Sequence, residues 1–330
     1  MTPAYDAYLA PARSTSQPIR LAVGLGLILA VYTAWMTLLG ALLGLFAVRG
    51  QIVAWAQGGD SGWMATALDI LSERLDWIGA GADPWALIWL LASFLGGWFG
   101  VSLAMRILHR RRGRDLLGRA PVVLRDFALG AGMMAVLGGA MGLVLIPALP
   151  RIDLATEPRV WLMFLPLALV GILIQAGAEE LVFRGYLQGQ LAARFASPLV
   201  WLGVPTAVFG FAHFAPGAMG ANTWLVVFAA GVFGLVVSDL TARTGSLGLA
   251  WGLHFANNVL ALLVISVTGG LSGLALFSVP QGRPAAAADT GGHRRSGHCL
   301  DGLPAVAAAA LTVAFIRRAD YLGTATEGSR

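Results

Sequence analysis

The chain has 330 residues, of which 57% are hydrophobic and 12% are charged, about half the charged share of an ordinary soluble domain. This composition excludes a disordered chain, disfavours a soluble globule and favours a helical protein that crosses a membrane several times. The 22 basic residues are all arginine and the net charge is +5. Because arginine in short loops sets the topology of such proteins, we expect no nucleic-acid partner. A single cysteine, Cys299, excludes an intramolecular disulfide framework.

Apolar segments of nearly membrane-spanning length recur along the chain, separated by short polar loops. We therefore predict an all-α fold, a polytopic transmembrane bundle of seven to eight spans with its active site inside the membrane. The predicted spans are residues 21–48, 85–108, 127–149, 160–183, 199–214, 224–240 and 247–267, with a weaker one at 303–316.

The distribution of arginine predicts how the chain is oriented. The strongest basic cluster follows the second span, at residues 109–125, which places that loop in the cytoplasm. The acidic segment between the first two spans then lies outside. Within it, Met64, Leu68 and Leu75 recur at helical spacing opposite Asp69 and other acids. This pattern predicts an amphipathic helix on the membrane surface.

Four ionisable residues lie well inside predicted spans, where a charged side chain costs several kcal/mol. These residues are Glu179, Glu180, His213 and His254. Glu180 and Arg184 are four residues apart, so they share a helix face and can pair. Glu179 has no such local partner, and it is therefore the carboxylate that needs an explanation.

The spacing of these residues predicts that they meet. If the chain reverses at residues 195–198, Glu179 and His213 lie at similar depth, roughly 25 Å from the turn. His254 and Asn258 are four apart and face the same way, whereas Asn257 points elsewhere and suits an interhelical hydrogen bond.

A glutamate held by a histidine in an apolar pocket can take a proton from water, and histidine and asparagine can donate to a developing oxyanion. The set therefore predicts water-activated hydrolysis of an amide. The alternative from the residues themselves is a polar clamp between helices, with no catalysis.

Three short motifs now make the chain resemble a known family. Residues 179–184 match EExxxR, residues 209–213 match FxxxH, and residues 254–258 match HxxxN. Their order and spacing resemble the CPBP family, the CAAX-protease and bacteriocin-processing intramembrane peptidases, which include the Rce1-type CAAX prenyl endopeptidases. The resemblance covers residues 160–270.

The resemblance implies a role for each matching residue. Glu179 would activate the water, His213 would orient that water and assist as base, and His254 with Asn258 would stabilise the oxyanion. Glu180, Arg184 and Phe209 would support them. The family has been described both as zinc-dependent and as metal-free. Glu179, His213 and His254 would be the zinc ligands, but no HExxH helix is present, and we favour the metal-free mechanism without a cofactor.

We therefore expect an intramembrane endopeptidase that cleaves membrane-associated proteins or peptides in CAAX-type or bacteriocin-related processing. The partners would be membrane lipid and a protein or peptide substrate, prenylated or not, and the location a bacterial inner membrane. The alternatives are a non-catalytic scaffold or peptide-resistance protein, and a proton-coupled transporter. The expected regions are a cytoplasmic tail (1–20), an N-terminal membrane region (21–158), a catalytic core (159–270) and a C-terminal region with a weaker last span (271–330).

Overall fold

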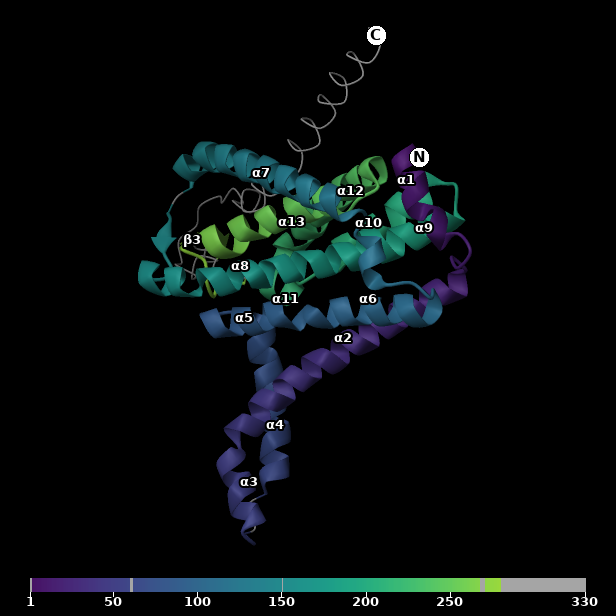
Figure 1. Cartoon of the computed structure of the whole chain (residues 1–330). Coiled ribbons are helices and arrows are strands. Elements are labelled where there is room, and N and C mark those ends of the chain that lie inside the picture. Colours follow the sequence, from purple (N-terminus) through teal and green to yellow (C-terminus); the bar gives the residue numbers. More distant parts are fainter. Residues whose placement is uncertain (1, 60–61, 150, 268–270, 280–330) are drawn as a thin grey trace, which may run out of the picture.

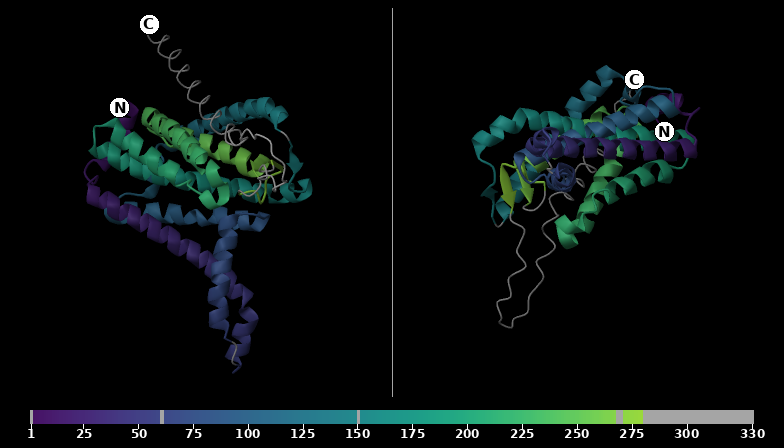
Figure 2. Two further views of the ribbon diagram at one scale, coloured as in Figure 1. Left: turned by 180° about the vertical axis from the view of Figure 1, so that it is seen from behind. Right: turned by 90° about the horizontal axis from the view of Figure 1, so that it is seen from below.

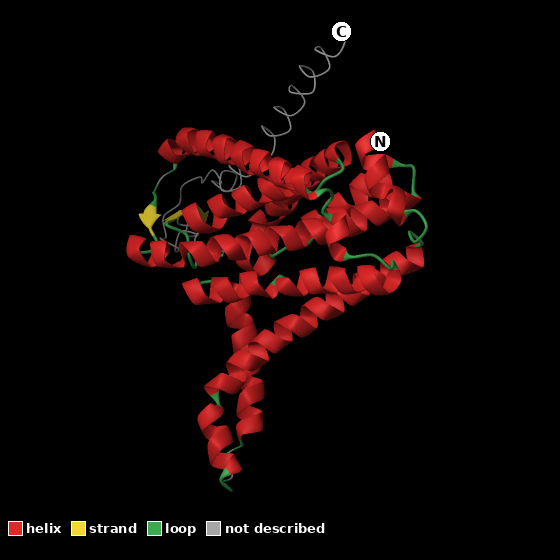
Figure 3. Ribbon diagram, viewed as in Figure 1, coloured by secondary structure: helices red, strands yellow, loops and turns green. Residues whose placement is uncertain are grey.

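The computed structural model describes residues 2–59, 62–149, 151–267 and 271–279, and these are almost entirely helical (Figure 3). Among them, five helical segments are long and apolar enough to cross a membrane, so the chain is an integral membrane protein. They are Pro18–Ala47, Pro84–Leu108, Ala120–Val144, Pro158–Arg194 and Thr223–Thr244. Two predicted spans instead form shorter apolar helices, Leu199–Phe211 and Gly248–Val264. The weaker predicted span at 303–316 lies outside the described residues.

The first part of the chain forms a short helix and a very long one. Helix α1 (Pro3–Leu9) is followed by a 3-10 turn, η1 (Ala10–Ala12), and by the 30-residue helix α2 (Pro18–Ala47). Helix α3 (Arg49–Ala56) continues beyond the end of α2, and α4 (Trp63–Ala80) turns back and packs along that end. The end of α2 together with α3 and α4, residues 40–59 and 62–80, projects from the bundle across the direction of its helices, and we call it the arm (Figure 1). Figure 2 shows the arm from behind and along its length.

The predicted amphipathic helix is present as α4, but half of its apolar stripe packs within the protein. Leu71 and Leu75 press on Gly40 of α2, where an added Cβ would lie 2.8 Å from a Leu75 methyl group. Met64 and Leu68 are each 63% exposed. The C-terminal half of the stripe therefore holds the arm together, and the N-terminal half remains on the surface.

The membrane-spanning body begins with α5 (Pro84–Ser93) and α6 (Leu95–Leu108), which together form one span. A 3-10 turn, η2 (Gly113–Leu116), leads into α7 (Ala120–Leu145), which ends in a second 3-10 turn, η3 (Ile146–Ala148).

The second half of the body contains the predicted site. Helix α8 (Pro158–Glu180) widens into a π-helical segment, η4 (Leu181–Gln188), and continues as α9 (Gly189–Arg194). After the turn come two continuous segments, η5 (Leu199–Gly203, π-helical) and α10 (Val204–Phe211). The remaining elements are α11 (Pro216–Met219), η6 (Gly220–Asn222), α12 (Thr223–Thr244), α13 (Gly248–Val259) and the π-helical η7 (Leu260–Val264).

These helices stack in layers in the order α7, α13, α8, then α5 with α6, and finally α2, while α10 and α12 pack beside them (Figure 1). Glycine allows the closest approach, between α13 and α7. A Cβ on Gly252 would lie 2.1 Å from the Phe127 carbonyl oxygen, and a Cβ on Gly248 would lie 2.3 Å from that of Val123. Close backbone contact through small residues is typical of helix pairs in membranes.

The loops predicted to be cytoplasmic meet at one end of the bundle. Thr2 donates to the Ala242 carbonyl (3.0 Å), Arg20 donates to the Leu108 carbonyl (3.2 Å), and Leu247 donates its backbone N–H to Leu117 (3.0 Å). The arginine-rich stretch 110–114 also follows α6 there. We call this region, which comprises residues 2–20, 108–119 and 242–247, the basic end.

A small sheet departs from the predicted all-α fold. Strand β3 (Phe277–Val279) pairs antiparallel with β1 (Asp153–Leu154) and parallel with β2 (Ile265–Val267), in the order β1-β3-β2. Leu274 is buried in the same hydrophobic cluster as Ile172 of α8. Residues 271–279 thus close the end of the bundle opposite the basic end and belong structurally to its body.

Candidate active site

The two glutamates lie where α8 ends and its helix widens. Glu179 and Glu180 are the last residues of α8, and η4 begins at Leu181. π-helical turns inside longer helices are rare and occur frequently at functional sites, because the extra residue re-aims neighbouring side chains. The two residues lie near the middle of the continuous helical segment Pro158–Arg194, well away from either end.

Glu180 lies at the centre of a fully buried ionic cluster. Its Oε1 accepts from Arg184 Nη1 at 3.1 Å, which is the pair expected from the i,i+4 spacing, and from His254 Nδ1 at 2.7 Å. The exposed fractions of the three side chains are 0%, 1% and 4%. Arg184 Nη2 also donates to the Gly234 carbonyl of α12 at 3.4 Å. Glu180 therefore ties α8 to α13 through His254, and its charge is balanced by Arg184.

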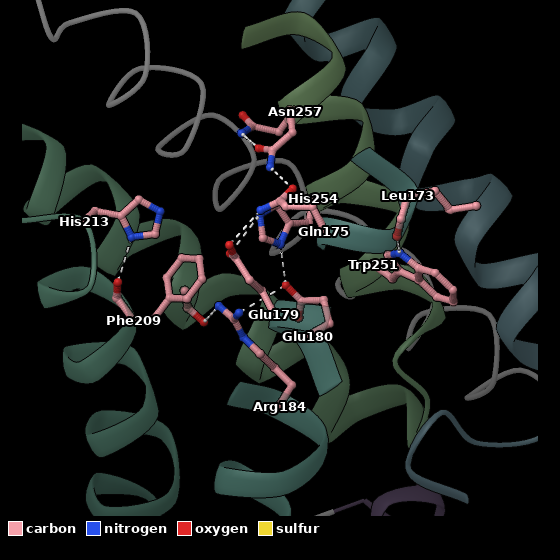
Figure 4. A network of polar contacts seen from close by, with 12 residues as sticks. Leu173, Gln175, Glu179, Glu180, Arg184, Phe209, His213, Trp251, His254 and Asn257 are labelled. Atoms are coloured by element: carbon pink, nitrogen blue, oxygen red, sulfur yellow. Dashed lines mark hydrogen bonds and ion pairs between the residues drawn. The ribbon is translucent and has the colours of Figure 1, made fainter. Parts of the chain in front are cut away.

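Glu179 is held differently, and one of its oxygens is free. Its Oε1 accepts from Gln175 Nε2 at 2.7 Å. Its Oε2 lies 3.6 Å from His254 Nε2 and has no hydrogen-bond partner among the described residues. The side chain is 17% exposed, against 0% for Glu180. Glu180 Oε2 also has no partner among the described residues, but its side chain is fully buried. Of the two neighbouring carboxylates, Glu179 is therefore the one that an incoming molecule can approach, and Figure 4 shows it beside His254.

Asn258 enters the site through an amide partner that the sequence did not indicate. Its Nδ2 donates to Gln175 Oε1 at 2.8 Å, and its Oδ1 accepts from Asn257 Nδ2 at 3.1 Å. Asn257 was expected to bond between helices, but its bond stays within α13. The side chains of Asn257, Asn258, Gln175 and Glu179 thus form one hydrogen-bonded chain across α13 and α8.

Aromatic rings enclose the cluster on the side of α10 and α12. The Phe209 ring lies 4.2 Å from the Arg184 guanidinium carbon and 5.9 Å from the centre of the His254 ring. Phe233 of α12 lies 5.4 Å from the same histidine ring, edge to face. These apolar contacts shield the ion pair from water on that side.

His213 is the predicted catalytic residue that the structure, over its described residues, does not bring into contact with either glutamate. It follows the end of α10, and its Nδ1 donates to the Phe209 carbonyl at 2.8 Å. Its ring lies 4.8 Å from the Phe209 ring, which separates it from the glutamates in Figure 4. Its link to His254 therefore runs through the ring of Phe209.

A pair of tryptophans holds α8 just before the glutamates. Trp98 of α6 donates to the Ile174 carbonyl at 2.9 Å, and Trp251 of α13 donates to the Leu173 carbonyl at 3.0 Å. Both rings lie against Gly177, where a Cβ would meet Trp98 at 2.6 Å. The two indoles fix the rotation and height of α8 about one and a half turns before Glu179.

Sequence reasoning missed Gln175, Phe233 and this tryptophan pair. The i,i+4 spacing of Gln175 and Glu179 was a usable signal, since amide and carboxylate side chains interact at that distance on a helix. The aromatic residues gave no such signal, because tryptophan and phenylalanine are common throughout the spans.

The residues of the alternative zinc site have suitable donor atoms but do not lie close enough together. The donors suit zinc, because both His213 and His254 donate through Nδ1 and leave Nε2 available. Within the residues that the structure describes, however, no three His, Cys, Asp or Glu side chains are grouped closely enough to hold one ion. The predicted set Glu179, His213 and His254 does not fit a metal as placed, and no step is derived through one.

Comparison with known families finds a match over the segment that carries this site. Residues 161–260 match the family model described as type II CAAX prenyl endopeptidase Rce1-like. This segment is an Rce1-like domain. It includes all three motifs, and the family is a family of proteases, so the resemblance drawn from the motifs is confirmed.

The chain is also similar to one curated protein that is itself uncharacterized. The uncharacterized protein YyaK of Bacillus subtilis is 35% identical over 129 residues. The match covers 38% of this chain and 42% of YyaK, so the chain spans less than half of that relative. No solved structure matches.

Proposed function

We propose that the protein is an intramembrane endopeptidase that hydrolyses peptide bonds of membrane-associated proteins or peptides with a water activated by Glu179. The single observation that carries the proposal is the buried, unpartnered Oε2 of Glu179, 3.6 Å from His254 Nε2. With the Nδ1–H of His254 donated to Glu180, the imidazole form of the ring presents a lone pair at Nε2. A water molecule at this point can donate to both atoms.

The chemistry follows from these two acceptors. Glu179 takes a proton as the water oxygen attacks the substrate carbonyl, and the C=O bond becomes an oxyanion. The second N–H of the Asn258 amide, which its bond to Gln175 leaves free, donates to that oxyanion. The tetrahedral intermediate then collapses, the C–N bond breaks, and the proton on Glu179 passes to the leaving amine. His213, at the edge of the site, would orient the water once substrate is bound.

The first test compares the wild-type protein with Glu179→Ala in hydrolysis of a fluorogenic hydrophobic peptide, prenylated and unprenylated. We expect the substitution to lower kcat by at least about 10³-fold, since the activated nucleophile is lost. Asp239→Asn, an exposed carboxylate on α12, is the control and should keep full activity. Undiminished cleavage by a folded Glu179→Ala protein would exclude this mechanism.

Metal dependence is tested on the same protein. We expect cleavage to persist after exhaustive dialysis against chelators, because the water is activated by a carboxylate in this proposal. Loss of activity that zinc restores would replace the metal-free mechanism with a metal-dependent one. Absence of cleavage under every condition would favour the scaffold or peptide-resistance function.

The location proposed is a bacterial inner membrane, with the basic end in the cytoplasm. The arginines of residues 110–114 carry this orientation. The substrate is proposed to be a CAAX-type or bacteriocin-related protein or peptide, and the prenylated and unprenylated peptides of the first test distinguish the two.

A further inference from the structure

Gln175 is a buried amide that connects the two functional halves of the site. It lies on α8, one turn before Glu179, and is 7% exposed. Its Nε2 donates to Glu179 on its own helix, and its Oε1 accepts from Asn258 on α13. It therefore touches both the proposed base and the proposed oxyanion donor.

The Glu179 end of this chain of hydrogen bonds determines which amide groups donate and which accept. An ionised carboxylate can only accept, so Gln175 must present its nitrogen to Glu179. Its oxygen then faces Asn258, which must present its own nitrogen in turn. The Asn258 oxygen faces Asn257, whose Nδ2 donates to it at 3.1 Å. The chain of bonds that starts at the Glu179 carboxylate thus sets the orientation of three amides.

The same bond selects which oxygen of Glu179 reacts. Oε1 is occupied by Gln175 at 2.7 Å, and Oε2 is left without a partner and directed at His254. A carboxylate without this anchor rotates about its terminal torsion, which has a broad, roughly two-fold profile. The anchor therefore keeps the free lone pair pointing at the place where water is activated.

We infer that Gln175 is a positioning residue that couples the base to the oxyanion donor: it holds Glu179 Oε2 toward the water and turns the Asn258 N–H groups toward the substrate carbonyl. This inference rests on the proposed function. It adds a residue outside the three motifs, and it predicts that Gln175 and Asn258 act as one unit.

The experiment measures kcat and KM for Gln175→Met, Asn258→Ala and the double variant with the fluorogenic peptide. Methionine fills a similar volume without hydrogen bonds. We expect Gln175→Met to lower kcat about 10- to 100-fold and to change KM by less than about threefold, because substrate binding does not require the bridge. In the double variant, the fold-loss in kcat should be smaller than the product of the two single fold-losses, because Gln175→Met already releases the Asn258 amide.

Two further variants separate positioning from folding. Gln188→Met removes another buried amide, that of Gln188 in η4, which donates to the Ser238 carbonyl at 2.9 Å. This variant should keep the wild-type kcat. Gln175→Asn retains a polar amide but is one methylene too short to reach both partners, so it should lose kcat while remaining folded.

The outcomes distinguish the inference from the function beneath it. Wild-type kcat in folded Gln175→Met or Gln175→Asn, with Glu179→Ala inactive, would overturn the positioning role and leave the peptidase intact. Fully multiplicative losses for Gln175 and Asn258 would overturn their coupling. Activity in Glu179→Ala would overturn both proposals together.

Discussion

Glu180 shows how a single charge can be kept in an apolar bundle. It is fully buried, yet it accepts from Arg184 and from His254, which come from different positions around it. Removing one member of such a buried ion pair leaves its partner charged and unpaired. The free energy lost in this way exceeds the net stabilisation that the intact pair provides. The neighbouring Glu179 takes no part in this ion pair, so its carboxylate is available for chemistry.

The first prediction compares the buried carboxylate of Glu180 with an exposed carboxylate. We expect Glu180→Gln to lower the free energy of unfolding by about 3–5 kcal/mol, because Arg184 would remain buried without its counter-ion. The matched control is Asp239→Asn, in an i,i+4 pair with Arg243 whose side chains are 42% and 46% exposed. It should cost less than about 1 kcal/mol. Titration with SDS in mixed micelles measures both, and equal losses would contradict the burial argument.

At the scale of the helix, the position of the active carboxylate depends on the indoles of α6 and α13. Trp98 and Trp251 donate to consecutive backbone carbonyls of α8, and Gly177 leaves room for both rings. The ring centres are 5.8 Å apart. The height of Glu179 in the membrane is therefore set by contacts from two other helices.

A Cβ at Gly177 tests this dependence. We expect Gly177→Ala to displace the indoles, to destabilise the protein by about 1–3 kcal/mol, and to lower kcat. The control is Gly139→Ala in α7, where no atom lies within 4 Å of the added Cβ. That variant should be neutral or more stable by about 0.5–1 kcal/mol, since alanine favours helix. Unfolding titration and the peptide assay measure the change in stability and in kcat. Identical behaviour of the two variants would contradict the role of the two indoles in positioning α8.

The helices and the motif residues were the most predictable parts of the molecule. Long apolar runs locate helices because every backbone group in a membrane must be paired internally, and charges inside those runs are rare enough to identify Glu179 and Glu180. Hydropathy could not show that the run beginning at Leu199 stops being helical at Phe211, because the following residues are apolar as well. Gln175 carries no charge, so the same search passed over it.

At the scale of the whole molecule, one histidine joins distant parts of the chain at the basic end. His109 follows α6 and is 3% exposed. It hydrogen-bonds to Thr15 before α2 (3.1 Å) and to Tyr186 of η4 (2.9 Å). Burial lowers the pKa of His109, and the nearby cations Arg20 and Arg111 lower it further. The folded protein therefore favours the neutral form of the His109 ring.

The corresponding prediction is a loss of stability in mild acid. The unfolded protein takes up a proton at this histidine near pH 6.5, whereas the folded protein does so at lower pH. Between these two pKa values the unfolded state binds more protons, so the free energy of unfolding falls as the pH drops below about 6.5. Unfolding titrations at pH 5.5 and 7.5 should show this loss, and His109→Asn should reduce it. An unchanged pH dependence in that variant would assign the effect to other groups.

The short helices beside the site have a consequence for the surrounding lipid. The segment Leu199–Phe211 has 13 residues and rises roughly 20 Å, about 10 Å less than the hydrocarbon thickness of a typical bilayer. A hydrophobic stretch shorter than the bilayer is accommodated by local thinning of that bilayer. We expect the membrane to be thinnest next to α10, where His213 lies at the helix end. Water and a polar peptide bond then have a shorter apolar distance to cross before they reach Glu179.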